Sequence, residues 1–155
     1  MKVALMLLLS AVPAVSFAQS PSPIKRTNPD ALSTPTGYSH VVEVAGPATI
    51  VYVAGQVARA KDGKVVGERD MKAQAEQVFK NLEAALAAAG AKFSDVVKMT
   101  TYTTDMSQAQ AIRDVRVRYF GDTVPASTMV GVPTLANPAY MLEIEVIAAV
   151  AAPKP

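Results

Sequence analysis

The fold class is decided by residues 70–104, which read DMKAQAEQVFKNLEAALAAAGAKFSDVVKMTTYTT. In the first half, apolar residues recur every three or four positions, the period of one helix face: Ala75, Val78, Leu82, Ala85, Leu86 and Ala89. Gly90 follows the last of them, where a left-handed cap ends many helices. Residues 96–104 are rich in β-branched side chains, which favour a strand. The stretch predicts a helix beginning at Asp70 and then a strand.

Further elements are expected on both sides of this pair. Ser107 and Gln110 have the spacing of a capping box, which predicts a second helix running to about Phe120. The turn Gly46-Pro47-Ala48 separates two β-rich runs, which we interpret as a hairpin. Strands are thus predicted near residues 41–45, 49–53, 127–132 and 140–150. The order β-β-α-β-α-β-β, with two helices, favours an α+β two-layer sandwich.

The last strand shows what such a sandwich leaves exposed. Leu142, Ile144 and Val146 alternate with other residues and suit the face that the helices cover. The opposite side carries a mixture of apolar and acidic residues, namely Met141, Glu143, Glu145 and Ile147. A mixed face of this kind is more suited to another subunit than to open water. We therefore predict a homo-oligomer in which the uncovered faces pack together.

The two ends of the chain are expected to lie outside the domain. Residues 1–18 combine Lys2, an apolar run and a small-residue cleavage site, which predicts a secretory signal peptide cut after Ala18. The apolar run is shorter than a membrane span and is interrupted by Pro13. Residues 19–37 hold four prolines and predict a flexible lead, followed by a domain at 38–150 and a tail at 151–155. The expected location is the periplasm or the exterior.

Composition limits the chemistry. The chain has no cysteine, which excludes thiol nucleophiles and thiolate metal sites, and His40 is its one histidine, which excludes a histidine metal cluster. No metal or organic cofactor is expected. The 15 basic residues are scattered against 13 acidic ones, so nucleic acid is not an expected partner. Hydrolytic triads have no support either, because no Ser/His/Asp pattern is present.

An ordered set of segments resembles the RidA family, also called YjgF. The segments are Val53-Ala54-Gly55-Gln56, residues 74–106, Pro125-Ala126-Ser127-Thr128 and residues 142–148, and the resemblance spans about residues 36–150. It implies a chorismate-mutase-like α+β fold and a homotrimer with clefts between subunits. Well-studied members hydrolyse reactive 2-imino and enamine acids to 2-keto acids and ammonia, without a cofactor.

The resemblance also implies site residues. The glutamate associated with the attacking water matches Glu145, and a tyrosine near the N-terminus matches Tyr38. Gly55 keeps the glycine of a Ser-Gly-Gln segment, and Met129 matches a residue that contributes its backbone. The arginine that holds the substrate carboxylate falls on Ser127, followed by Thr128. Residues 125–132 are thus interpreted as a cleft wall beside Glu143 and Glu145.

The exchange of arginine for serine weakens the usual family activity. A guanidinium grips a carboxylate through two charge-assisted bonds, whereas Ser127 offers one neutral hydroxyl. Efficient deamination of free 2-imino acids is therefore not expected, and a neutral substrate suits Ser127 and Thr128 better. Lys98 and Arg59 are geometric possibilities for a compensating cation.

Three functions remain open at this point. The first is a deaminase-like hydrolase in which Glu145 acts on a small imine or enamine. The second is a trimer that binds or senses a small molecule in the same cleft without turnover. The third is RNA cleavage, an activity of some relatives that the scattered charges disfavour. For Glu143, pairing with backbone or with a neighbouring subunit is favoured over a chemical role.

Overall fold

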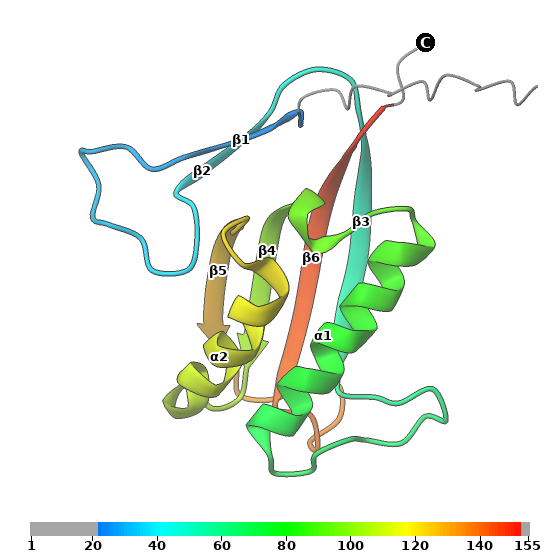
Figure 1. The fold of residues 1–155 in the computed structure, drawn as a ribbon. Helices are drawn as coiled ribbons and strands as arrows, with labels where there is room; N and C mark the ends of the chain where they lie inside the picture. The colour runs from blue at the N-terminus through cyan, green and yellow to red at the C-terminus, as the bar shows by residue number, and fades with distance from the viewer. Residues whose placement is uncertain (1–21, 153–155) are drawn as a thin grey trace, which may run out of the picture.

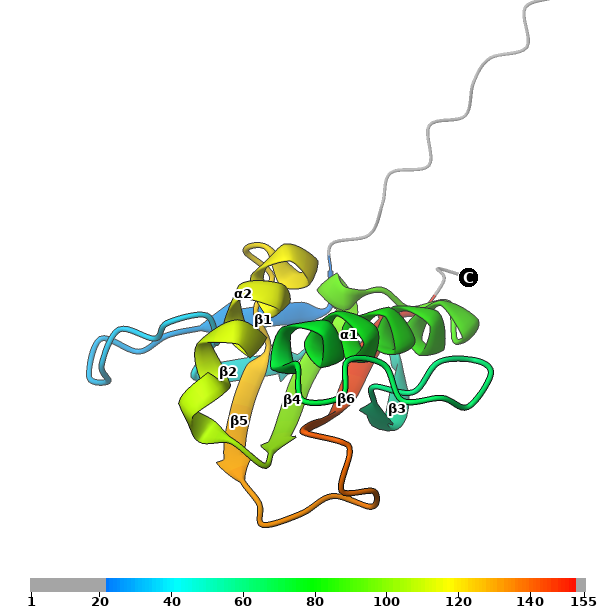
Figure 2. The same cartoon turned by 90° about the horizontal axis from the view of Figure 1, so that it is seen from below.

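The computed structural model describes residues 22–152, so the predicted signal peptide lies outside the described residues. A four-stranded sheet has the order β3-β6-β4-β5, and both helices lie on one side of it (Figures 1 and 2). Its strands are β3 (Ala48–Val57), β4 (Val96–Thr103), β5 (Ala126–Gly131) and β6 (Leu142–Ala151). The helices are α1 (Met71–Ala88) and α2 (Ala109–Phe120). This is the predicted α+β two-layer sandwich.

Helix α1 begins and ends where the sequence predicts. Asp70 is the N-cap, and its side chain accepts a hydrogen bond from the Ala73 backbone N–H at 3.0 Å. Gly90 follows the helix with φ +69, the left-handed conformation that favours glycine. The start of α2 differs from the prediction. A short 3-10 turn (Met106–Gln108) precedes it, and the capping carboxylate belongs to Asp105 rather than to the predicted Ser107.

The predicted hairpin between residues 41–45 and 49–53 is wrong. Strand β2 (Val41–Val44) pairs antiparallel with β1 (Ile24–Thr27), and β3 pairs with β6 instead. The segment expected as a flexible lead therefore holds a strand at residues 24–27. Arg26 ties this two-stranded ribbon to the sheet, because its guanidinium donates to the backbone oxygens of Val124, Ser94 and Val96.

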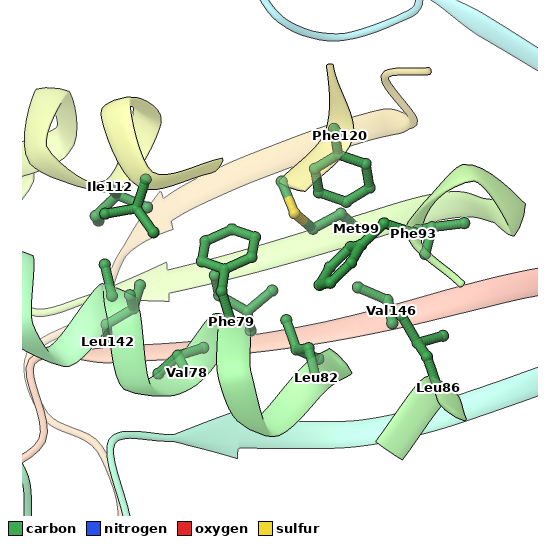
Figure 3. Close-up of a cluster of buried hydrophobic side chains, with 14 of the residues drawn as sticks. Val78, Phe79, Leu82, Leu86, Phe93, Met99, Ile112, Phe120, Leu142 and Val146 are labelled. Carbon is green, nitrogen blue, oxygen red and sulfur yellow. The ribbon is translucent and has the colours of Figure 1, made fainter. Parts of the chain in front are cut away.

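The core fills the layer between the helices and the sheet (Figure 3). Leu142, Ile144 and Val146 are fully buried there, as the alternation in the last strand predicts. Phe79 of α1 lies at the centre, with its ring 5.0 to 6.4 Å from those of Phe93, Tyr119 and Phe120. Within residues 22–152, no helix is long and apolar enough to cross a membrane. Packing of one sheet face thus accounts for the fold.

No helix within the described range covers the other face of the sheet, which we call the open face. Tyr52 of β3 is 78% exposed and Ile50 is 43% exposed on this face. Glu143, Glu145 and Ile147 alternate with the buried residues of β6 and therefore point the same way. The open face is thus both apolar and acidic, as the sequence predicts, although Met141, which was expected on this face, packs against the core instead.

Candidate functional site

Strand register places Glu145 and Thr128 on the open face together. Thr100 of β4 is the register partner of both Glu145 on β6 and Thr128 on β5. Residues directly opposite on neighbouring strands point to the same face of a sheet, so the three form one row. Lys98, two residues before Thr100, stands in the next row beside Ile147. A carboxylate, two hydroxyls and an ammonium group therefore share this face.

A hollow of about 400 Å³ lies among these side chains. We call it the open-face hollow, and it is lined by Tyr52, Val53, Ala54, Lys98, Thr100, Glu145, Val146 and Ile147. Lys98 Nζ donates a hydrogen bond to Thr128 Oγ1 at 2.6 Å, and the Tyr102 hydroxyl donates to Glu145 Oε1 at 3.3 Å. Desolvation and, secondly, the charge of Glu145 raise the pKa of Tyr102, which keeps this hydroxyl a proton donor. The carboxylate of Glu145 therefore accepts a hydrogen bond from a protonated phenol group.

The predicted site residue Gly55 lies against Glu143 rather than Glu145. It sits in a β-bulge, where the register between β3 and β6 shifts between Val53 and Gln56. A Cβ at position 55 would collide with the carboxyl group of Glu143, so only glycine admits this side chain over the backbone. Glu143 makes no ion pair with any side chain in the described part of the chain. It is a second candidate for the acting carboxylate.

Ser127 and Met129 point away from both glutamates. The register partner of Ser127 is Met99, which is buried in the core, and Met129 packs against the same core. Because side chains alternate along β5, Ala126, Thr128 and Val130 point to the open face, and Thr128 is the one predicted site residue among these three. In one protomer, Ser127 therefore does not face Glu145, and the interpretation of residues 125–132 as a wall beside Glu143 and Glu145 stays a prediction for a cleft between subunits.

Tyr38 lies in a second hollow, on the helix-covered side of the sheet. This helix-side hollow, of about 660 Å³, is lined by Thr34, Thr36, Gly37, Tyr38, Gln110, Arg113, Asp114, Arg116 and Val117. Two hydrogen bonds from the residues directly after Tyr38 fix this loop. Ser39 Oγ donates to the Val124 backbone oxygen at 2.9 Å, and the His40 N–H donates to Asn28 Oδ1 at 2.8 Å. The Tyr38 and His40 rings meet edge to face, with centroids 5.2 Å apart.

Two arginines in the helix-side hollow were missed by sequence reasoning. Arg113 and Arg116 are three residues apart on α2, and Arg116 is only 8% exposed. Desolvation and, secondly, the charge of Arg113 lower the pKa of Arg116. A weak signal was present, because Arg116 directly follows the buried Val115 and lies one turn after the buried Ile112. Helix periodicity alone does not show that a flanking arginine is covered.

The two cations proposed from the sequence have different positions: Lys98 lines the open-face hollow, whereas Arg59 does not. Arg59 donates to the Gly63 backbone oxygen at 3.1 Å and closes a turn there. Lys98 contacts Thr128, as described above. Within residues 22–152, no three histidine, aspartate or glutamate side chains gather as ligands for a metal ion. The polar side chains that line these two hollows are carboxylates, hydroxyls, one lysine and two arginines, together with the amide of Gln110.

The fold and the hollows define a class of small α+β protein with a two-layer sandwich and polar sites on both sides of its sheet. Residues 28–150 match the model of a family described as Endoribonuclease L-PSP. The chain belongs to this family, which is the RidA (YjgF) family that its motifs resemble.

Individual relatives agree with this assignment. A RutC family protein of Pyrococcus horikoshii is 36% identical over 112 residues, covering 72% of this chain and 85% of that protein. A protein of Dermatophagoides farinae named 2-iminobutanoate/2-iminopropanoate deaminase is 34% identical over 110 residues, covering 71% and 83%. The solved structure of YyfB, a Rid family protein of unknown function from Yersinia pestis, superposes with a TM-score of 0.77 at 34% identity, covering 83% and 99%.

Proposed function

We propose that the protein hydrolyses a small, reactive imine or enamine to a carbonyl compound and ammonia. The observation that carries this proposal is the pair of carboxylates, Glu143 and Glu145, on the open face of a RidA-family fold. A relative of similar length, named as a deaminase of 2-iminobutanoate and 2-iminopropanoate, supports the same reaction class.

The reaction needs a group that moves protons and no redox partner. Water adds to the carbon of the C=N bond, and a carboxylate accepts a proton from that water as the C–O bond forms. The same carboxyl group returns that proton to the nitrogen, which gives a carbinolamine. It then takes the proton of the new hydroxyl group and passes it to the amino nitrogen, so that the C–N bond breaks, ammonia leaves and the carbonyl forms. An enamine first takes a proton on carbon and loses one from nitrogen to become the imine. A glutamate beside a hydroxyl, such as Glu145 beside Tyr102, fits this general acid–base role.

The two glutamates compete for the role. Glu145 is the sequence-based candidate, and the hydrogen bond from Tyr102 orients its carboxylate. Glu143 lies over the Gly55 backbone, next to the glycine segment that the family resemblance associates with the cleft. Separate substitutions distinguish them, because each carboxylate has its own neighbours on the open face.

We also propose a homotrimer with its sites between protomers, as the resemblance implies. Glu143 and Glu145 point to the open face, whereas Tyr38, Ser127 and Met129 lie on the helix-covered side. A second copy of the chain is needed to bring the two groups to one cleft. The exposed apolar side chains of Tyr52 and Ile50 support burial of the open face against such a copy.

Ser127 sets the limit on the usual family activity. Its hydroxyl does not replace a guanidinium, and removing a charged partner from a partly buried carboxylate costs on the order of 2–5 kcal/mol of binding. At position 127 the chain therefore has no group that holds a free 2-imino acid efficiently. This difference also supports a second function, a trimer that binds or senses a small molecule without turnover.

The predicted signal peptide adds a proposal about location. Cleavage after Ala18 would deliver the protein to the periplasm or the exterior, away from the cytosolic enzymes that form most imino acids. Mass spectrometry of the protein purified from its host is expected to find an N-terminus at Gln19. An intact N-terminus at Met1 in the mature pool would contradict export.

Ammonia release from freshly generated 2-iminopropanoate tests the proposed reaction. We expect wild type to exceed the buffer rate, and substitution of the acting carboxylate, Glu145→Gln or Glu143→Gln, to lower the rate about 100-fold or more. Glu83→Gln, on the exposed side of α1, is the matched control and keeps the wild-type rate. Saturable ligand binding with no ammonia above buffer would favour the binding or sensing function instead.

A further inference from the structure

Arg116 is a buried cation without a counterion among the described residues. It is more than nine-tenths buried, and within residues 22–152 it makes no side-chain hydrogen bond and no ion pair. Asp114 lines the same hollow, but its carboxylate accepts a hydrogen bond from Gln110 Nε2 at 2.7 Å. None of its guanidinium nitrogens is among the fully enclosed unpaired atoms of the described residues, so the tip of this otherwise covered side chain reaches the hollow. A partly desolvated cation in such a place favours an anion beside it.

Arg113 adds a second positive charge to the same hollow. It lies one helical turn before Arg116, and its charge contributes to the lowered pKa of Arg116. Like charges at this spacing destabilise a helix. An anion between or beside the two guanidinium groups would relieve both the repulsion and the desolvation.

The neighbouring loop is shaped to fit the Arg116 side chain. Gly37 has φ +72, which favours glycine, and a Cβ at this position would collide with the Arg116 guanidinium. Ser39 and His40 fix the loop just beyond it through the bonds to Val124 and Asn28. The backbone therefore approaches the guanidinium closely, while Tyr38 brings an aromatic ring and a hydroxyl to the same hollow.

We propose that the helix-side hollow binds the carboxylate of a small 2-oxo or 2-imino acid, with Arg116 and Arg113 as its cations. This supplies from α2 the positive charge that Ser127 does not provide. A planar guanidinium matches a carboxylate with two parallel hydrogen bonds, and a hollow of about 660 Å³ has room for a ligand of this size. That the bound acid is a substrate rests on the proposed function; that it binds here does not.

Equilibrium binding of pyruvate to the full mature protein, followed by calorimetry, tests this assignment without turnover. Pyruvamide is the neutral match for pyruvate, and we expect it to bind at least about 30-fold more weakly, the fold-change of ~2 kcal/mol for a lost charged contact. Arg116→Gln is expected to weaken pyruvate by a similar factor, and Arg116→Lys by less. Arg113→Gln is expected to weaken it about fivefold or more, because its side chain is exposed.

Arg118→Gln is the matched control, because Arg118 is also on α2 but pairs with Glu76. It is expected to bind pyruvate as wild type does. Removal of an uncompensated buried charge is not expected to lower the melting temperature of unliganded Arg116→Gln. If Arg116→Gln does not fold, the pyruvate affinity of Arg113→Gln tests the assignment on its own.

Three results would overturn the assignment. Pyruvate and pyruvamide binding equally would show that no cation reads the carboxylate. Inorganic phosphate displacing pyruvate with the same affinity would reduce the hollow to an unselective anion site. Absence of pyruvate binding to wild type, with loss of the oligomer in Arg116→Gln, would mean that a carboxylate of another copy pairs with Arg116. Binding of pyruvate without ammonia release would instead contradict only the proposed reaction.

Discussion

The open-face hollow and the helix-side hollow lie on opposite sides of one sheet and differ in charge: Lys98 balances Glu145 in the first, whereas Arg113 and Arg116 outnumber Asp114 in the second. In the first, Glu145 accepts a hydrogen bond from Tyr102 and Lys98 donates to Thr128, so the polar groups are already engaged within the chain. In the second, Arg113 and Arg116 have no acidic partner within residues 22–152. A single chain thus places Glu143 and Glu145 on one side of its sheet and the two arginines on the other. In the proposed trimer, the two groups would meet in a cleft between copies.

The shared core should control both hollows equally, and its disruption is the largest expected effect. Phe79→Ala removes a fully buried ring that touches three other aromatic rings, which is expected to cost about 3–5 kcal/mol of unfolding free energy. Denaturant unfolding measures this loss. Lys80→Ala, next to it on the exposed side of α1, is the control and should change stability by less than about 0.5 kcal/mol. A loss below about 1 kcal/mol for Phe79→Ala would contradict the described core.

Assembly should depend on the open face alone. Tyr52→Glu places a charge at the most exposed apolar side chain of this face, and we expect a shift from trimer to monomer in size-exclusion chromatography with light scattering. The fold of the monomer, followed by circular dichroism, is expected to persist because Tyr52 is outside the core. Val117→Glu, at an exposed apolar residue on α2, is the comparison variant. A trimer that survives Tyr52→Glu but not Val117→Glu would place the contact on the other side of the sheet.

Two glycine substitutions should separate the hollows from each other. Gly55→Ala forces the Glu143 carboxyl group away, and Gly37→Ala forces the Arg116 guanidinium away. We expect Gly55→Ala to lower ammonia release about tenfold with little change in pyruvate affinity, and Gly37→Ala to lower pyruvate affinity by a similar factor. An unchanged rate for Gly55→Ala would leave Glu145 as the acting carboxylate. Equal effects of both variants on both measurements would mean that the hollows do not act separately.

A smaller effect is expected from Asp105, which stands between the core strand β4 and α2. Hydrogen bonds from Gln108 and, secondly, Ser107 lower the pKa of its carboxyl group below the ordinary value of 3.8. Because the folded state favours the charged form, this stabilisation is present above pH 3.8 and is lost as the pH falls through the lowered pKa. The melting temperature of Asp105→Asn should therefore lie below that of wild type at pH 7 and approach it below pH 3.8. A constant difference across this range would contradict the assignment.

The sequence predicts the elements and the packed face of this fold well, because both depend on local periodicity. The boundaries of α1 follow from Asp70 and Gly90, and the buried side of β6 follows from strict alternation. Strand pairing is a different matter. The β-rich run after Gly46 pairs with β6, nearly a hundred residues away, and no local pattern distinguishes this from a hairpin.

The candidate site is predicted only in part, for related reasons. Motif resemblance leads to Tyr38, Gly55 and Glu145, but the face to which each side chain points depends on register. Ser127 points to the helix side because it is opposite Met99 rather than Thr100. Arg116 was missed because a charged residue on a helix is ordinarily solvated, and no local pattern shows that the loop at Gly37 lies against its guanidinium.

The central claim, that one site takes its carboxylate and its cation from different copies, has a direct test by complementation. Arg116→Gln and the double variant Glu143→Gln/Glu145→Gln are each expected to be inactive in ammonia release. In trimers formed by co-expression of the two, about one quarter of the sites would combine an intact half from each chain and recover that fraction of wild-type activity. Mixed trimers no more active than their parents would contradict a site shared between copies.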